Sequence, residues 1–335
     1  MSMQCAVIGA GSFGTCLAMQ LGRLGHEVTL WDHRPERAAR TQASRHNEDY
    51  LPGLTLPEAV TVTADLVLAL YQKRLVVAVV PSQSMREVFA RASELVDSAA
   101  IVCSAAKGVE MGTYNTPSEI LRQVLPRPLH DRICVLSGPS FAAEVAEDLP
   151  TAVVVAGHDE IATHRVASAF HGSNFRVYHS DDMVGVEVAA AVKNVMAIAC
   201  GISDGMGLGL NARAAIITRG LAEITRLGVA KGADPLTFAG LAGMGDLVLT
   251  CTGDLSRNRR VGLALGQGRT LQEAIAELGQ VAEGVMTTKS AYNLASRMDI
   301  DMPITGEIYR ILYEDKPAKQ AMADLLARRR KAERE

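Results

Sequence analysis

The sequence predicts an α/β protein with a doubly wound parallel sheet in its N-terminal half and an all-α C-terminal half. In the first half, short β-rich runs alternate with helical stretches, as in sheets with crossover helices. Beyond about residue 187, only long helical segments follow. Because 335 residues exceed the usual size of one core, we expect two domains, residues 1–187 and 188–335.

The chain opens with an apolar run over Met3–Ile8, which suits a buried parallel strand, and Thr15–Leu24 has helical composition. Between them, Gly9 would allow a tight turn, Gly11 would let a pyrophosphate approach, and Gly14 would let helix and strand pack closely. The helix N-terminus favours anions. A plain structural turn is the alternative, but the strand–turn–helix context favours a Rossmann-type dinucleotide site.

A second strand is expected over Glu27–Trp31, after Gly25 as the helix C-cap, and it ends at Asp32 and His33. An acid at this place hydrogen-bonds the ribose 2′-hydroxyl of NAD, whereas a nearby arginine accommodates the 2′-phosphate of NADP. The chain has both Asp32 and Arg34. We therefore expect NAD or NADP as the cofactor, with dual use as the hypothesis.

The later elements follow from composition and periodicity. Further strands are expected over Leu75–Val80, Ala100–Ser104, Ile133–Ser137 and Thr151–Ala156, with helical stretches such as Ser84–Leu95 between them. Helices are expected over 188–202, 212–229, 270–279, 286–298, 305–314 and 317–331. No low-complexity linker separates the halves, so we expect a direct passage into the long helix near 183–188.

Composition excludes several classes of protein. A net charge of −3 gives no basic surface on the scale that nucleic acid requires. The six cysteines lack metal-ligand spacing and are expected to be reduced core thiols. The N-terminus makes a poor signal peptide, and Lys193 and Asn194 interrupt the apolar segment 188–202, so we expect no membrane span and a cytoplasmic protein.

Two predicted strand ends carry residues that suit a ligand crevice, because the carboxyl ends of parallel strands line it. Lys107 follows Ser104 and could reach a phosphate or a reacting oxygen; a solvated loop lysine is the alternative. In Ser137–Glu144, a strand runs into a Gly-Pro turn and then a helix. Ser140 could cap that helix, and the same N–H groups could bind an anion or a substrate hydroxyl.

Lys193 lies in a helical segment with little polar surface. Desolvation lowers the pKa of a buried lysine, so this residue could act as a general base near neutral pH. The alternative is a side chain that extends along apolar surface to water.

Asp246 and Thr250 are four residues apart and would share one helix face, suited to a polyol or to the ammonium of Lys193. The cluster Arg257–Arg260 offers planar donors for phosphate. Its alternative is a solvated helix start capped by Ser256.

Taken in order, these segments resemble the bacterial NAD(P)-dependent sn-glycerol-3-phosphate dehydrogenase family over nearly the whole chain. The matching stretches are residues 8–15, 107–108, 137–142, 191–195, 211–213, 245–252 and 256–260. The resemblance implies reversible hydride transfer between dihydroxyacetone phosphate and sn-glycerol 3-phosphate, mainly toward reduction, for phospholipid synthesis. It departs at Asp32, where the family often has a small residue, and this departure argues against a preference for NADP.

The resemblance also implies roles for single residues. Lys193 would take the hydroxyl proton in alcohol oxidation and return it in reduction, and Lys107 is expected in the same catalytic set. Asp246 would orient either Lys193 or the substrate hydroxyls, and no metal is needed. The expected cofactor contacts are Gly9, Gly11, Ser12, Phe13, Gly14, Asp32, His33, Arg34, Lys107, Ala142, Arg257, Val281 and Glu283. The expected substrate contacts are Lys107, Gly138, Ser140, Lys193, Asn194, Asp246, Thr250, Ser256, Arg257 and Asn258.

Two other functions compete with this one. A related two-domain dehydrogenase of 3-hydroxy acids would keep Lys193 and use the arginines for a carboxylate. A nucleotide-sensing protein would bind the cofactor without turnover, since fold alone does not establish function. The apolar surface expected on the helical half is compatible with a homodimer.

Overall fold

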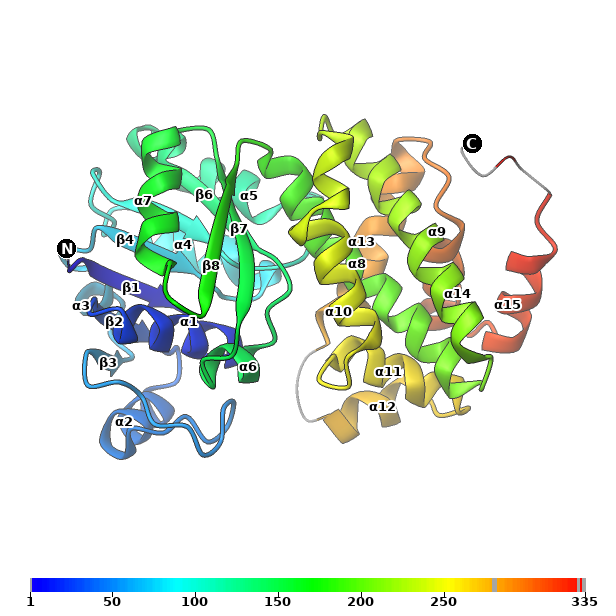
Figure 1. Ribbon diagram of the computed structural model, residues 1–335, viewed down its shortest axis with the longest axis horizontal. Coiled ribbons are helices and arrows are strands. Elements are labelled where there is room, and N and C mark those ends of the chain that lie inside the picture. The colour runs from blue at the N-terminus through cyan, green and yellow to red at the C-terminus, as the bar shows by residue number, and fades with distance from the viewer. Residues whose placement is uncertain (1, 279–281, 330–331, 333–335) are drawn as a thin grey trace.

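The computed structural model describes residues 2–278, 282–329 and 332. Its N-terminal half is built on an eight-stranded sheet with the order β3-β2-β1-β4-β5-β6-β7-β8 (Figure 1). The strands are β1 (Gln4–Ile8), β2 (Glu27–Trp31), β3 (Val60–Thr63), β4 (Leu75–Ala78), β5 (Ile101–Ser104), β6 (Ile133–Ser137), β7 (Thr151–Gly157) and β8 (Phe175–Ser180). Because β1 and β4 are neighbours while β2 and β3 lie beyond β1, the strand order reverses at β1, which is where such sheets bind ligands.

The predicted fold class is confirmed, and the sheet is parallel from β3 to β6. β7 pairs with β6 in the antiparallel direction, and β8 is parallel to β7. The sequence prediction missed the two edge strands, β3 and β8. β3 has only four residues, and most residues of β8 are at least partly exposed, so neither shows the continuous apolar run of a central strand.

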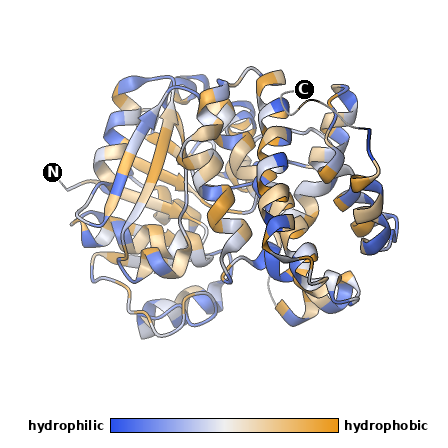
Figure 2. Cartoon of the chain, turned by 45° about the vertical axis from the view of Figure 1, so that its right-hand side comes forward, coloured by the Kyte–Doolittle hydropathy of each residue, from blue (hydrophilic) through white to orange (hydrophobic). Residues whose placement is uncertain are grey.

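Helices cover both faces of the sheet: α1 (Ser12–Arg23), α2 (Pro35–Ser44), α3 (Leu66–Leu70), α4 (Ser82–Ala92), α5 (Pro117–Val124), α6 (Ala142–Ala146) and α7 (Glu160–Phe170), with a 3₁₀ turn at Arg127–Arg132. Alternate residues of a strand enter opposite cores, so Val7 packs on one side and Ala6 and Ile8 on the other. Apolar residues concentrate in the strands (Figure 2).

The C-terminal half is helical, as predicted. It contains α8 (Met183–Gly205), α9 (Gly209–Ala230), α10 (Asp246–Thr252), α11 (Arg257–Gly266), α12 (Leu271–Leu278), α13 (Glu283–Arg297), α14 (Pro303–Tyr313) and α15 (Ala318–Leu326). A 3₁₀ turn at Pro235–Ala239 and a π-turn at Leu241–Gly245 precede α10.

The central helix α8 lies very close to α11 because glycines face each other. A Cβ at Gly201 would lie 2.1 Å from the carbonyl oxygen of Arg259, and one at Gly262 would lie 2.1 Å from that of Ile198. The helix is buried along nearly its whole length, which fixes the position of every side chain that it carries.

α8 takes part in the cores of both halves. Met183 and Val186 pack into a core of the sheet, whereas residues from Val188 onward pack into the helical core. We therefore propose that the domain boundary falls within the first turns of α8, at residues 187–188. By length and composition α8 could cross a membrane, but 94% of its apolar window is buried inside the protein, as in a core helix.

Candidate active site

The glycine turn between β1 and α1 has the shape that a dinucleotide requires. Gly9 has a φ of 125°, and a Cβ there would lie 2.9 Å from the carbonyl carbon of Val79. A Cβ at Gly14 would lie 1.8 Å from the carbonyl oxygen of Gly9, so helix and turn touch directly. A Cβ at Gly11, in contrast, would meet no atom within 4 Å. Tight packing behind the turn and free space before it fit a pyrophosphate on the helix N-terminus.

The loop after α2 folds over this turn. Ser12 donates a hydrogen bond from Oγ to the carbonyl oxygen of Tyr50, at 3.1 Å. The amide of Asn47 donates to the carbonyl oxygen of Ala10 at 2.9 Å and to Oγ1 of Thr15 at 2.8 Å. Residues 47–50 therefore form a wall beside the N-terminus of α1.

The carboxylate of Asp32 lies at the end of β2, as expected, but its side chain is only 1% exposed. Arg37 donates to both of its oxygens, from Nε at 2.5 Å and from Nη2 at 2.7 Å, and the backbone N–H of Arg34 donates to it at 3.0 Å. The side chains of His33 and Arg34 are exposed. The sequence analysis missed Arg37; its only signal was a basic residue in the first turn of the helix that follows Asp32.

Three residues that are distant in the sequence form a charge cluster between the two halves. Lys193 on α8 donates to Asp246 Oδ1 at 2.5 Å and to Thr250 Oγ1 at 2.7 Å. Lys107, which follows β5, donates to Asp246 Oδ2 at 3.0 Å, and its Nζ lies 5.4 Å from the ring centroid of Phe13. Each oxygen of one buried carboxylate thus accepts from a lysine of a different half.

The electrostatics of this cluster are unusual because it is buried. Burial lowers the pKa of Lys193 to about 7, although the charge of Asp246 opposes the shift. Burial alone would raise the pKa of Asp246, but the charges of Lys107 and Lys193 hold it below its usual value. The geometry supports a buried lysine, not one that extends to water, since its side chain is only 5% exposed.

Asp246 and Thr250 share one face of α10, as the spacing predicts, and Thr250 also donates to the carbonyl oxygen of Asp246 at 2.6 Å. The loop after β6 packs against the same region. A Cβ at Gly253, just after α10, would lie 2.5 Å from the ring of Phe141, and one at Gly245, just before it, 3.6 Å from Pro139. The loop and α10 are therefore held together.

Gly138 and Ala142 lie in or next to this loop, and Gly138 has a φ of 142°. The prediction that Ser140 caps the following helix is wrong. The N-cap of α6 is Phe141, no side chain caps it, and Ser140 donates from Oγ to the carbonyl oxygen of Gly138 at 2.9 Å. The turn brings its hydroxyl back onto the strand end instead of forward onto the helix.

Ser256 caps α11, as in the alternative interpretation of this segment, by accepting a hydrogen bond from the N–H of Arg259. The arginine cluster does not act as one group. Arg259 pairs with Asp204 at 2.7 Å and with Asp254 at 2.7 Å, so it is unavailable to a phosphate. Arg257 is exposed at the start of the same helix.

The start of α13 packs against Asn258 and Asn194. Asn258 accepts a hydrogen bond from the N–H of Gly284 at 2.9 Å, and a Cβ on that glycine would lie 2.9 Å from the carbonyl oxygen of Asn194. Burial raises the pKa of Glu283, while the charges of Arg257 and of the cluster lysines lower it. Val281, a predicted cofactor contact, lies outside the described residues.

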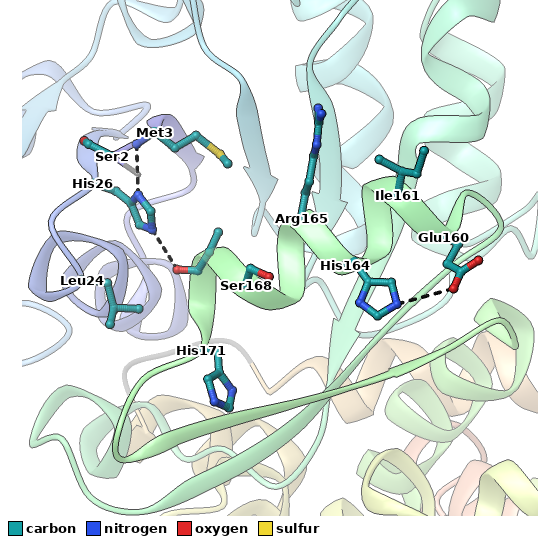
Figure 3. Close-up of a pocket in the computed structure, with 11 residues that line it drawn as sticks. Ser2, Met3, Leu24, His26, Glu160, Ile161, His164, Arg165, Ser168 and His171 are labelled. Atoms are coloured by element: carbon teal, nitrogen blue, oxygen red, sulfur yellow. Dashed lines mark hydrogen bonds and ion pairs between the residues drawn. The ribbon is translucent and has the colours of Figure 1, made fainter.

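A cavity of about 700 Å³ lies elsewhere, between the start of β1 and α7. Figure 3 shows His26, His164 and Arg165 among its lining residues. It is at the amino end of β1, whereas the glycine turn is at the carboxyl end. Within the described ranges, no group of three or more His, Cys, Asp or Glu side chains could hold a metal ion.

The Rossmann sheet, its open glycine turn and the buried lysine cluster, in which Lys107 lies near Phe13 of the turn, define a two-domain nicotinamide-dependent dehydrogenase. Comparison with known proteins gives the family. The chain belongs to the NAD-dependent glycerol-3-phosphate dehydrogenase family: the model of the family's N-terminus matches residues 4–163, and that of its C-terminus matches residues 182–323.

Individual relatives agree over the full length. The chain is 54% identical to a glycerol-3-phosphate dehydrogenase [NAD(P)+] of Geobacter sp. strain M21, with 99% of both chains covered. It is also 54% identical to the glycerol-3-phosphate dehydrogenase [NAD(P)+] of Geobacter metallireducens, with both chains covered completely. A crystal structure of glycerol-3-phosphate dehydrogenase from Coxiella burnetii superposes with a TM-score of 0.93 at 43% identity, covering 98% of this chain and 99% of that one. These matches favour this family over the hydroxy-acid alternative and the sensor.

Proposed function

We propose that this enzyme reduces dihydroxyacetone phosphate to sn-glycerol 3-phosphate reversibly, with Lys193 as the acid and base. The observation that supports this most strongly is the pair of lysines on one buried carboxylate, next to an open dinucleotide turn. When bound, the nicotinamide supplies or accepts the hydride. The protein must supply the proton and hold the substrate.

In the direction of reduction, the ammonium of Lys193 gives a proton to the carbonyl oxygen as the carbonyl carbon gains a hydride. In oxidation, the neutral amine takes the hydroxyl proton. A pKa of about 7 lets the same group do both near neutral pH. Asp246 and Thr250 hold the Lys193 nitrogen in place, since both accept hydrogen bonds from it.

The substrate phosphate would be bound by Arg257 at the start of α11, where the guanidinium is exposed. Phosphate binding far from the carbonyl aligns the reacting carbon and so contributes to the rate. We propose the further substrate contacts Lys107, Gly138, Ser140, Asn194, Ser256 and Asn258, which come from both halves.

The cofactor residues that fit the open turn are Gly9, Gly11, Ser12, Phe13 and Gly14, with His33 and Arg34 at the end of β2. Lys107, Arg257, Ala142 and Glu283 would face the nicotinamide end, because they come from the loops and helix starts around the lysine pair. Val281 stays a prediction of the sequence.

The test follows the absorbance of NADH and, separately, of NADPH with dihydroxyacetone phosphate as substrate. Unphosphorylated dihydroxyacetone is the control for phosphate recognition. We expect oxidation of the nicotinamide only with the phosphorylated substrate. Equal rates with both substrates would remove Arg257 from the account, and no oxidation with either cofactor would contradict the proposed reaction.

Three further parts of the proposal concern the cell. We propose that the enzyme works mainly in the direction of reduction, that its product serves phospholipid synthesis, and that it is cytoplasmic. A homodimer stays a prediction of the sequence.

A further inference from the structure

We propose that Arg37 is a specificity-determining residue that neutralises Asp32 and thereby admits the 2′-phosphate of NADP. The inference rests on the proposed function and concerns the adenosine end of the same site. It addresses a conflict in the sequence, in which an acid typical of NAD sites precedes an arginine typical of NADP sites.

Arg37 neutralises the charge of Asp32. In NAD sites, the carboxylate at this place accepts a hydrogen bond from the ribose, and its negative charge repels a 2′-phosphate. Here Arg37 forms a planar two-bond pair with both carboxylate oxygens, at 2.5 and 2.7 Å. Such pairs are the strong form of ionic hydrogen bond. The carboxylate therefore presents no net negative charge to a ligand.

Both side chains of this pair are buried. The side chains of Asp32 and Arg37 are 1% and 7% exposed. Because neither group is in contact with bulk water, the pair forms part of the site wall. His33, 63% exposed, and the exposed Arg34 come directly after Asp32. A ligand at the end of β2 would thus meet cationic or neutral polar groups.

The pair is also linked to the glycine turn. The guanidinium of Arg37 lies over the ring of Tyr50, 4.9 Å from its centroid, and the carbonyl oxygen of Tyr50 accepts from Ser12 in the first turn of α1. Arg37 is thereby fixed from two sides, by Asp32 and by the loop that covers the turn. It acts through Asp32 as a positioning residue, because its Nε and Nη2 are already engaged.

The test measures ligand binding, so it does not depend on turnover. Calorimetry gives the dissociation constants of 2′,5′-ADP and of 5′-AMP, and their ratio reports recognition of the 2′-phosphate. We expect the wild type to bind 2′,5′-ADP more tightly. Arg37→Gln should lower this preference by about tenfold, because Asp32 then faces the phosphate unpaired. Thermal unfolding shows whether each variant is folded.

Two further variants separate the mechanisms. Asp32→Asn with Arg37→Gln should restore the wild-type preference to within about threefold, because no unpaired charge remains. Asp32→Asn alone should raise the preference for 2′,5′-ADP. This variant tests the proposal even if Arg37→Gln does not fold. Arg40→Gln is the matched control, since Arg40 is on the same helix and pairs with Asp49 at the surface, 58% exposed.

The inference is overturned where folded Arg37→Gln keeps the wild-type ratio, where the double variant stays as poor as the single one, or where the wild type prefers 5′-AMP. A poor double variant would mean that Arg37 contacts the phosphate itself. Reduction of dihydroxyacetone phosphate is measured in parallel with NADH and, separately, with NADPH. Its absence with both cofactors in the wild type contradicts the proposed function, whereas its presence with unchanged binding ratios contradicts only the role of Arg37.

Discussion

The two halves of the molecule build their parts of the site from different materials. At the pyrophosphate position, the sheet half uses backbone and space: a glycine with a left-handed φ, a helix packed on a carbonyl, and an open position at Gly11. The helical half uses charge held away from water, with Lys193 and Asp246 both buried. We therefore expect that substitutions can impair cofactor affinity and proton transfer separately, because different atoms serve the two functions.

The largest effect is expected at the buried lysine. Lys193→Ala removes the proposed proton donor and should lower kcat by about 10²- to 10⁴-fold, the usual contribution of a general acid. Cofactor affinity should change little, because the glycine turn is untouched. Steady-state kinetics and titration of cofactor binding measure the two effects, with Lys319→Ala on the exposed side of α15 as the control.

If Lys193→Ala retained most of its turnover, the helical half would not supply the proton. A parallel loss of cofactor affinity would instead show that the two halves do not act separately. Either outcome would contradict the separation of cofactor binding and proton transfer between the two halves.

The glycine turn should respond in the opposite way. Gly14→Ala places a Cβ 1.8 Å from the carbonyl oxygen of Gly9, and we expect a loss of about 3 kcal/mol in the free energy of unfolding. Gly11→Ala meets no atom, so its stability should be unchanged while its affinity for the cofactor falls by about tenfold. Chemical denaturation and cofactor titration distinguish the two variants.

The contrast between these two glycines is the informative result. Equal stability losses would mean that Gly11 also supports packing, and unchanged cofactor affinity in Gly11→Ala would place the pyrophosphate elsewhere.

The same comparison explains what could be predicted from the sequence. The glycine turn follows from local spacing, and Lys193 is conspicuous because a charge in an apolar helix is rare. The contacts of the lysine do not follow, because Asp246 is 53 residues from Lys193 and 139 from Lys107. Only the packing of α10 against α8, and of α8 against the sheet, brings these side chains together.

Competing hydrogen-bond and ion-pair partners explain why the predictions for Ser140 and Arg259 differ from the structure. The hydroxyl of Ser140 donates to a carbonyl within its own turn, so the helix cap expected there does not form. Arg259 is taken by two aspartates, one of them on α8. Short hydroxyls and exposed arginines have many partners within reach, and local spacing does not choose among them.

A more moderate effect is expected from pH. Since the pKa of Lys193 is about 7, kcat for reduction should be constant at lower pH and fall by about tenfold per unit above that value. In oxidation, kcat should rise up to the same pH and then level off. Asp246→Asn should shift both profiles to lower pH, because the charge of Asp246 raises the pKa of Lys193. Profiles that ignore pH between 6 and 8 would assign the proton to another group.

The smallest effect concerns a residue that links α8 to the sheet half. Glu187, in the first turns of α8, accepts hydrogen bonds from the N–H of Ser118 at 2.8 Å and from its Oγ at 2.5 Å, and so holds α5 of the sheet half. Burial raises its pKa to about 7, above the value of about 4.3 expected in the unfolded chain. The folded state therefore keeps this proton over that interval, and its stability should fall as pH rises through it.

Glu187→Gln cannot ionise and should lose this dependence, so it should gain on the order of 2 kcal/mol relative to the wild type between pH 5 and pH 8. Denaturation across this range measures the difference, and Glu160→Gln, with a side chain 87% exposed on α7, should behave as the wild type. A constant difference between Glu187→Gln and the wild type would mean that Glu187 is ionised throughout, held by Ser118. The negative charge of Glu187 would then be as well stabilised as the charge of Lys193, although Glu187 contacts the sheet half. Buried charge would in that case be a feature of both halves and not mainly of the helical one.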